Sequence, residues 1–286
     1  MVQFTNILDF VIMMPLGPKI MRAFAITPKE FAYVVSAYGF SAAISAILGS
    51  FFIDLFDRKK ALLFLYCGFT LGTIACGLAP NHIALIAARI IAGAFGGIMG
   101  GHIFSILGDN IIETHRGKAT GAVMSAFGFA SVVGVPVGLA LAENWSWHTP
   151  FLALGVLCFI VLFSLNFKLP LLRQSTRDKK NKIHHFKAVI REPNHQRAFL
   201  LSIFLILSGF MVIPFISPYM VRNVGLLEKE LPYMYFLGGL CTLVTSNLIG
   251  RLSDRIGKHK TFYIIGTCAL IPILLITSLP KLPLIS

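Results

Sequence analysis

Charged residues are scarce in this sequence, and acidic ones are the scarcest. Of 286 residues, 12 are Asp or Glu and 25 are Lys or Arg, which gives a formal net charge of +13. Charged residues make up 13% of the chain, whereas soluble domains contain about 25%. Hydrophobic residues make up 56%, and the mean hydropathy is +0.78. A soluble core cannot absorb that much apolar surface, so the composition indicates a membrane protein.

Paired cysteines and reactive clusters are also missing. The five cysteines have no paired spacing and lie in or beside apolar runs, which excludes a disulfide framework and a cysteine metal site. The sequence shows no serine, histidine and acid cluster, no phosphate-binding loop and no haem motif, so we expect no enzyme activity, no ATP site and no cofactor. The basic residues lie in short loops rather than on one exposed face, which excludes nucleic-acid binding.

What the sequence does have is long apolar runs. A bilayer requires about 17 to 25 residues per helical span. Runs of that length predict an all-α, polytopic transmembrane bundle with spans near residues 4–24, 31–53, 61–79, 83–107, 119–141, 149–169, 198–220, 231–250 and 261–280.

One long polar segment divides these spans. It is too short for a folded domain and is rich in lysine and arginine, so we interpret it as a basic linker. The predicted organisation is a six-helix bundle over 1–170, a cytoplasmic linker over 171–197 and a partial bundle of three helices over 198–286.

Lysine and arginine also predict the orientation. Most of them collect in the linker and in the loops on its side of the membrane, which places that side and the N-terminus in the cytoplasm. Lys19, Arg22 and Lys29 favour the opposite orientation for the first helix, but later loops can override it. The predicted location is the plasma membrane, or the inner membrane of a bacterium.

Two similar polar segments recur far apart in the chain, GSFFIDLFDRKK from Gly49 to Lys60 and GRLSDRIGKHK from Gly250 to Lys260. Each joins two apolar runs, so both are predicted to be tight turns on one side of the bilayer. A carboxylate at a helix end can hold a neighbouring guanidinium in one conformation and release it in another. This favours a gate; a turn that only sets topology is the alternative. The candidate gating residues are Asp54, Arg58, Lys59, Gly250, Asp254, Arg255, Gly257 and Lys258.

The fourth predicted span contains an arginine. A charge at that depth costs about 2.5 to 3.5 kcal/mol unless it faces a partner or water, so Arg89 is expected to face the protein interior. At about 100° per residue, Gly93, Gly96 and Gly100 lie on the same stripe and permit close helix approach. Arg89 bound to backbone carbonyls, or extended toward the membrane surface, is the alternative.

The fifth predicted span carries Gly134, Pro136 and Gly138. Proline within a spanning helix frees a carbonyl and allows a bend, while the glycines admit a neighbouring helix. A kinked packing helix without a further role explains the same residues.

Asp9 is the one carboxylate clearly within an apolar run of the sequence. Desolvation disfavours its charged form, which makes Asp9 a candidate proton carrier. A carboxylate that only favours the helix N-terminus is the alternative. With Met1 at one membrane face, Asp9 lies about 6 Å deep, whereas Arg89 lies about 10 Å from the opposite face. We therefore expect the two not to pair directly.

Several aromatic, methionine and polar residues in the spans can line a substrate path, because such side chains adapt to varied apolar ligands. Ordinary helix packing explains them equally well. They are Met13, Met14, Pro15, Tyr33, Tyr38, Pro214, Ser217 and Asn247.

The repeated turn, the two parts and the linker resemble the major facilitator superfamily, and the nearest branch is the drug or sugar efflux proton antiporters. The second turn fits the family pattern better than the first, where Ser50, Leu55 and Asp57 depart from it. The arginine of the fourth span resembles one associated with proton transfer in that family. The fifth span is similar to the antiporter signature, although Val135 separates its glycine from its proline.

The resemblance implies a secondary active transporter that exports small molecules of the drug or sugar class in exchange for protons, by alternating access. Asp9 and Arg89 would act in proton coupling. Members usually have twelve spans, so the resemblance also implies that the last three are lacking. The alternatives are a facilitator or symporter for sugars or other nutrients, and a truncated, non-transporting membrane interaction protein. The implied partners are protons, a small-molecule substrate and the bilayer.

Overall fold

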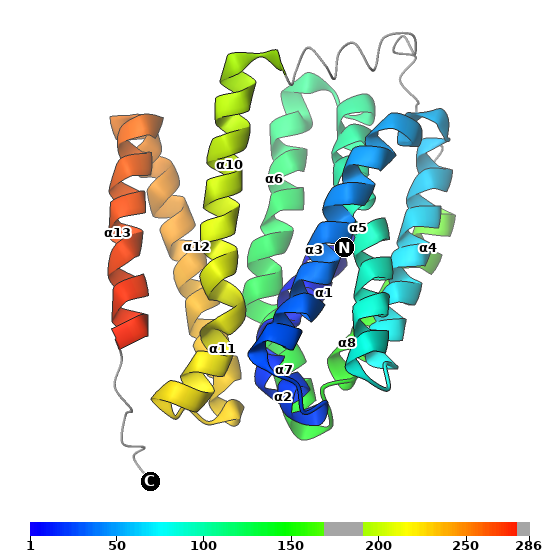
Figure 1. The fold of residues 1–286 in the computed structure, drawn as a ribbon. Helices are drawn as coiled ribbons and strands as arrows, with labels where there is room; N and C mark the ends of the chain where they lie inside the picture. Colours follow the sequence, from blue (N-terminus) through cyan, green and yellow to red (C-terminus); the bar gives the residue numbers. More distant parts are fainter. Residues whose placement is uncertain (169–190, 279–286) are drawn as a thin grey trace.

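The computed structural model describes residues 1–168 and 191–278, and all its regular elements there are helices (Figure 1). This confirms the predicted all-α class. The α-helices are α1 (Val2–Ile12), α2 (Gly17–Ala23), α3 (Pro28–Phe52), α4 (Arg58–Gly77), α5 (His82–Asn110), α6 (Glu113–Phe129), α7 (Val135–Asn144), α8 (Thr149–Lys168), α10 (Pro193–Val212), α11 (Ile216–Tyr219), α12 (Leu231–Ile256) and α13 (Lys258–Ser278).

Six segments of the described chain are long and apolar enough to cross a membrane, which agrees with a multi-pass membrane protein. They cover the second to seventh predicted spans, and α12 and α13 cover the last two. Most of the predicted linker, 171–197, lies outside the described residues. The six segments are Pro28–Phe52, Arg58–Gly77, His82–Asn110, Ala119–Asn144, Thr149–Phe167 and Pro193–Val224.

The first predicted span is not one helix, so the prediction of a continuous span over 4–24 is wrong. α1 ends at Ile12, a turn follows, and α2 begins at Gly17. Pro15 and Pro18 cannot donate a backbone hydrogen bond, and Pro18 occupies the first turn of α2, where a helix tolerates proline. Hydropathy alone does not register this break, because the turn residues are themselves apolar.

Polar side chains at the helix starts define where the spans begin. Thr27 and Glu30 form a reciprocal capping box at the start of α3. The carboxylate of Asp57 accepts a hydrogen bond from the Lys60 backbone N–H at the start of α4, and Asn81 caps α5 in the same way. These caps satisfy backbone donors that the helix itself leaves unpaired.

The turns at Asp54 and Asp254 lie at the same end of the molecule, which is the upper end in Figure 1. The α5–α6 connection lies there too, whereas α2 and the α4–α5 connection lie at the lower end. Gly257, with a φ of 89°, forms the turn between α12 and α13. A side chain at that φ is strained, so glycine is suited to the position.

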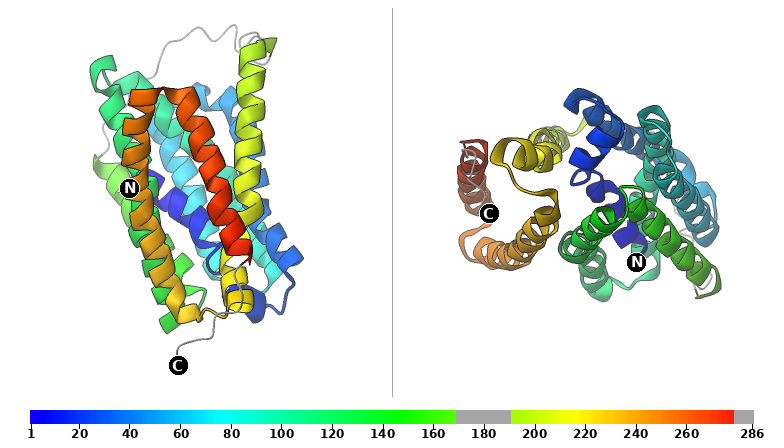
Figure 2. Two further views of the ribbon diagram at one scale, coloured as in Figure 1. Left: turned by 90° about the vertical axis from the view of Figure 1, so that its left-hand side faces the viewer. Right: turned by 90° about the horizontal axis from the view of Figure 1, so that it is seen from below.

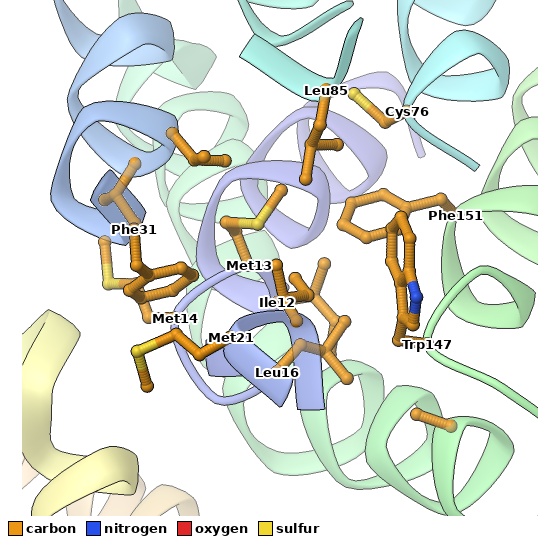
Figure 3. Packing of buried hydrophobic residues seen from close by; sticks show 14 of the residues in the cluster. Ile12, Met13, Met14, Leu16, Met21, Phe31, Cys76, Leu85, Trp147 and Phe151 are labelled. Atoms are coloured by element: carbon orange, nitrogen blue, oxygen red, sulfur yellow. The ribbon is translucent and has the colours of Figure 1, made fainter. Parts of the chain in front are cut away.

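A large buried cluster joins residues of α1, α2, α3, α4, α5, α7 and α8 with Leu231 of α12, and Figure 3 shows part of it from close by. The turn between α1 and α2 contributes Met13, Met14 and Leu16, and these side chains pack near Phe31 of α3 and Phe151 of α8. Met13 and Met14, which the sequence offered as lining for a substrate path, are core residues, since their exposed fractions are 0% and 4%.

The helices fall into two groups, which Figure 2 shows from below: α1–α8, and α10–α13 to one side of them. Contacts between the groups include α12 against α7, and α11 against α2. α12 also contacts the π-helix η2 (Ala130–Gly134), where a Cβ added to Gly239 would lie 2.9 Å from the Val132 Cα. At this crossing the two backbones approach as closely as glycine allows.

Candidate functional site

Arg89 and Asp9 form a fully buried ion pair in the first group of helices. Arg89 Nη1 donates to Asp9 Oδ2 at 2.7 Å and to the Asp9 carbonyl oxygen at 3.1 Å. Thr73 Oγ1 of α4 donates to the other carboxylate oxygen at 3.1 Å. Both charged side chains have an exposed fraction of 0%. Removing one member would leave an uncompensated buried charge, so the pair links α1 to α5 strongly.

The expectation that Asp9 and Arg89 do not pair is wrong. It assumed that Met1 lies at a membrane face, whereas α1 begins near mid-height of the bundle and descends to the lower end (Figure 1). Arg89 lies about 10 Å from the start of α5, which is also at the lower end. The two residues are therefore at the same depth. The expectation that Arg89 faces the interior agrees with this geometry.

Tyr38 of α3 covers the ion pair. Its ring lies over the Arg89 guanidinium, with 4.4 Å from Cζ to the ring centroid, and its hydroxyl donates to Asn6 Oδ1 at 2.7 Å. Asn6 Nδ2 in turn donates to the Gly96 carbonyl oxygen at 3.2 Å. A Cβ on Gly96 would lie 2.5 Å from the Tyr38 hydroxyl oxygen, and one on Gly93 would lie 2.5 Å from the Tyr38 carbonyl oxygen. The glycine stripe of α5 thus makes room for this tyrosine.

Two donors of Arg89 remain without a hydrogen-bond partner among the described residues, Nε and Nη2. Buried donors are nearly always paired in folded proteins, so two unpaired donor nitrogens are unusual. The guanidinium is held by Asp9 and by the ring of Tyr38, and the Cys76 thiol lies near it.

An open cavity of about 240 Å³ adjoins this cluster. The side chains of Asn6 and Tyr38 belong both to its wall and to the network beside the ion pair. None of the described residues that line it carries a charge. The lining residues are Asn6, Ile7, Phe10, Tyr38, Gly39, Ala42, Gly96 and Gly97.

At the upper end, Arg58 connects the start of α4 to the end of α5. Its Nε and Nη2 donate to Asp109 Oδ2 at 3.1 and 2.8 Å, and its exposed fraction is 5%. The buried His102 places Nε2 at 2.9 Å from the Arg58 carbonyl oxygen. Lys59 beside it is partly buried. Arg58 therefore contacts a carboxylate of its own helical group.

The rest of the predicted gating set is only partly described. The side chains of Asp54, Gly250, Asp254 and Lys258 lie outside the described residues. Arg255 is exposed in the last turn of α12, and Gly257 forms the turn that follows. Whether these residues form a gate stays a prediction.

The fifth predicted span contains an irregular turn at its predicted bend. Pro136 lies in the first turn of α7 and cannot donate a backbone hydrogen bond. The π-helix η2 directly precedes α7. A Cβ on Gly134 would lie 2.7 Å from Leu8 Cδ1, and one on Gly138 would lie 2.6 Å from Ile12 Cδ1. These glycines let α1 approach, so the helix that carries Asp9 is seated against this segment.

At the lower end, an ion cluster crosses between the two groups of helices. Lys19 Nζ of α2 lies 2.6 Å from Glu143 Oε2 at the end of α7 and 3.9 Å from Glu228 Oε2, which precedes α12. Arg22 also contacts Glu228. This cluster could not be predicted, because nothing in the sequence relates residues so far apart.

Residues 1–284 match the Major Facilitator Superfamily. The chain belongs to this superfamily. It is 25% identical over 255 residues to the uncharacterized MFS-type transporter YceJ of Bacillus subtilis (strain 168), which covers 88% of this chain and 65% of that protein. It is 26% identical over 248 residues to the inner membrane transport protein YdhP of Escherichia coli (strain K12), covering 84% of this chain and 62% of YdhP. The chain thus spans less than two thirds of the length of these relatives.

Solved structures show the same fold. A bacterial homologue of the human lysosomal transporter Spinster, in an inward-facing and unoccupied conformation, has a TM-score of 0.73 at 17% identity, with 89% of this chain and 60% of that one covered. A D-xylose-proton symporter has a TM-score of 0.66 at 14% identity, with coverage of 89% and 68%. At such low identity the likeness shows the fold alone.

Proposed function

We propose that this superfamily member takes part in secondary active transport, as a proton-coupled exporter of small molecules that works by alternating access. The observation that carries the proposal is the Asp9–Arg89 pair, a fully buried ion pair at the meeting of α1, α3, α4 and α5. A membrane protein retains such a costly pair for a function more often than for stability. The transporter names of the relatives support the same proposal.

Proton binding at Asp9 would act on the packing of these helices. A protonated Asp9 carries no charge, so its attraction to Arg89 weakens, while the guanidinium keeps its contact with the Tyr38 ring. Ligand in the adjoining cavity and a proton on Asp9 can then favour different arrangements, which is the requirement for coupled exchange.

The proposed gate lies at the upper end of the molecule. In the proposal, the gate is formed by Asp54, Arg58, Asp254 and Arg255. The protein lies in the plasma membrane, and its upper end and its N-terminus face the cytoplasm. The proposed units are a six-helix bundle over 1–170, a linker over 171–197 and a partial second bundle over 198–286. The substrate class proposed is drugs or sugars.

Flux in proteoliposomes tests the function. The purified 286-residue chain is reconstituted, a pH gradient is imposed, and movement of radiolabelled chloramphenicol and isopropyl-thiogalactoside is measured beside luminal pH. We expect gradient-driven flux of one probe that a protonophore abolishes. In Asp9→Asn this flux falls at least about tenfold, while the control Glu192→Gln, an exposed carboxylate at the start of α10, keeps it.

The other outcomes separate the alternatives. Flux of either probe that persists with the protonophore indicates a facilitator, and flux in the direction of proton movement indicates a symporter. Absence of any flux, with the protein correctly folded and inserted, contradicts transport by this chain and favours an interaction protein.

A further inference from the structure

Tyr38 lies between the cavity and the ion pair, and it contacts both. Its ring lies over Arg89 at 4.4 Å, and the same side chain forms part of the cavity wall. Its exposed fraction is 6%, and its hydroxyl is fixed by Asn6 at 2.7 Å. A ligand pressed against this wall therefore acts on a ring that is packed on the guanidinium.

The chemistry of the cavity indicates what it can hold. The aromatic rings of Phe10 and Tyr38 lie 5.2 Å apart, and Phe10 lies 5.6 Å from Phe210 of α10, so the aromatic row reaches the second group of helices. The amide of Asn6 is engaged by Tyr38 and Gly96. With no charged lining residue and its amide already paired, the cavity suits an uncharged ring.

The size of the cavity limits the ligand. Sites that enclose whole drug-sized molecules measure about 300 to 1,000 Å³, so a cavity of about 240 Å³ fits one ring-bearing part of a ligand. A Cβ on Gly39 would meet nothing within 4 Å, although Gly39 lines the cavity. A larger residue there fills the space without a clash in the backbone.

We infer that this cavity binds an uncharged, ring-bearing part of the ligand and that Tyr38 is the positioning residue that transmits its occupancy to the Asp9–Arg89 pair. The inference rests on the proposed function. Besides Arg89, the titratable groups near Asp9 among the described residues are Tyr38 of α3, Cys76 of α4 and Cys158 of α8. Coupling through Tyr38 makes ligand affinity depend on the protonation of this cluster, because the linkage between two sites is reciprocal.

Equilibrium dialysis of the purified full chain with radiolabelled chloramphenicol, an uncharged nitrobenzene derivative, tests the inference. The dissociation constant is measured at pH 6 and pH 8. We expect the unmodified chain to bind about tenfold more tightly at pH 8, because in an exchanger the proton and the ligand exclude each other. Asp9→Asn is expected to bind equally at both pH values.

The variants divide the two parts of the inference. Gly39→Leu should weaken binding at least about tenfold at both pH values, and Gly266→Leu, an exposed and uncrowded position in α13, should not. Tyr38→Leu should bind equally at both pH values, whereas Tyr38→Phe, which keeps the ring over Arg89, should retain the pH ratio of the unmodified chain. Tyr38→Met replaces Tyr38→Leu if that variant does not fold.

Each contrary result overturns a stated part. No saturable binding of chloramphenicol, or unchanged binding in Gly39→Leu, contradicts the ligand class assigned to the cavity. An unchanged pH ratio in Tyr38→Leu, or its equal loss in Tyr38→Phe, contradicts transmission through the ring. Tighter binding at pH 6 that depends on Tyr38 refutes exchange as the proposed function but supports the role of Tyr38. Binding as expected without flux in proteoliposomes counts against the proposed function alone.

Discussion

The two ends of the helical bundle use their charged residues differently. At the upper end, Arg58 contacts Asp109, and both belong to the first group of helices. At the lower end, Lys19 and Arg22 of the first group contact Glu228, which belongs to the second. The side chains of the upper pair are 6% and 18% exposed, whereas at the lower end Glu228 is 11%, Lys19 20% and Arg22 65% exposed.

The difference separates two roles for an ion pair. Arg58 and Asp109 hold α4 to α5 within one group, so their contact contributes to the stability of that group, beside the gating role proposed for Arg58. The lower cluster joins parts that must separate if the molecule opens at that end, so it contributes to the balance between conformations. The contrast can be tested at each end separately.

Removing Asp109 should have the largest effect. Asp109→Leu leaves the buried Arg58 without this carboxylate, so we expect a loss of about 3 kcal/mol in the free energy of unfolding, the lower limit for a broken buried pair. Thermal unfolding in detergent, followed by circular dichroism, measures the loss. The double variant Arg58→Leu/Asp109→Leu should recover most of it, since the buried guanidinium that lost this carboxylate is removed as well. Equal loss in both variants would show that the pair itself is not the cause.

Reversing Glu228 should alter the conformation. Glu228→Arg replaces attraction by repulsion of Lys19 and Arg22, so the lower ends of the two groups should move apart. Spin labels at the exposed positions Lys29 and Asn223 report the distance, on a background in which the exposed Cys67, Cys241 and Cys268 are serine.

A charge swap provides the control for this experiment. Arg22→Glu combined with Glu228→Arg should restore the short distance, because the attraction is rebuilt with opposite signs. Glu192→Gln removes an exposed carboxylate at the start of α10, outside this cluster, and should leave the distance unchanged. A distance that does not respond to Glu228→Arg would remove the proposed difference between the ends.

Salt should have the smallest effect and should act on one end only. Raising the ionic strength to about 1 M shortens the Debye length to about 3 Å, which weakens the exposed contact of Arg22 but hardly affects the buried Arg58 pair. We expect a partial increase in the Lys29–Asn223 label distance. Unfolding of the unmodified chain and of Asp109→Leu should respond to salt equally. A salt response that differs between the two proteins would show that salt screens the Arg58–Asp109 pair as it screens an exposed ion pair.

The spans were predictable because the bilayer requires long apolar helices, and hydropathy reports them directly. The interior position expected for Arg89 follows from the cost of a charge in hydrocarbon, without any knowledge of its partner. The break between α1 and α2 was harder to predict, because its turn residues are apolar and only Pro15 and Pro18 indicate it.

The partners of the charged residues were not predictable. Whether Asp9 meets Arg89 depends on the depth at which α1 begins, and a hydropathy pattern does not set that depth. Asp109 was missed because it lies just beyond an apolar run, where a carboxylate looks like an ordinary loop residue. The roles of the gating and coupling residues remain predictions that the variants above test.

The close crossing at Gly239 has a mechanical consequence. Gly239 lies 8 residues after Leu231 and 17 before Ile256, so it divides α12 into arms of about 12 and 25 Å at 1.5 Å per residue. If α12 tilts about this point as a rigid rod, its upper tip travels about twice as far as its lower tip. A small separation of the ion cluster at the lower end would thereby produce a larger displacement at the upper end, with Gly239 as the pivot.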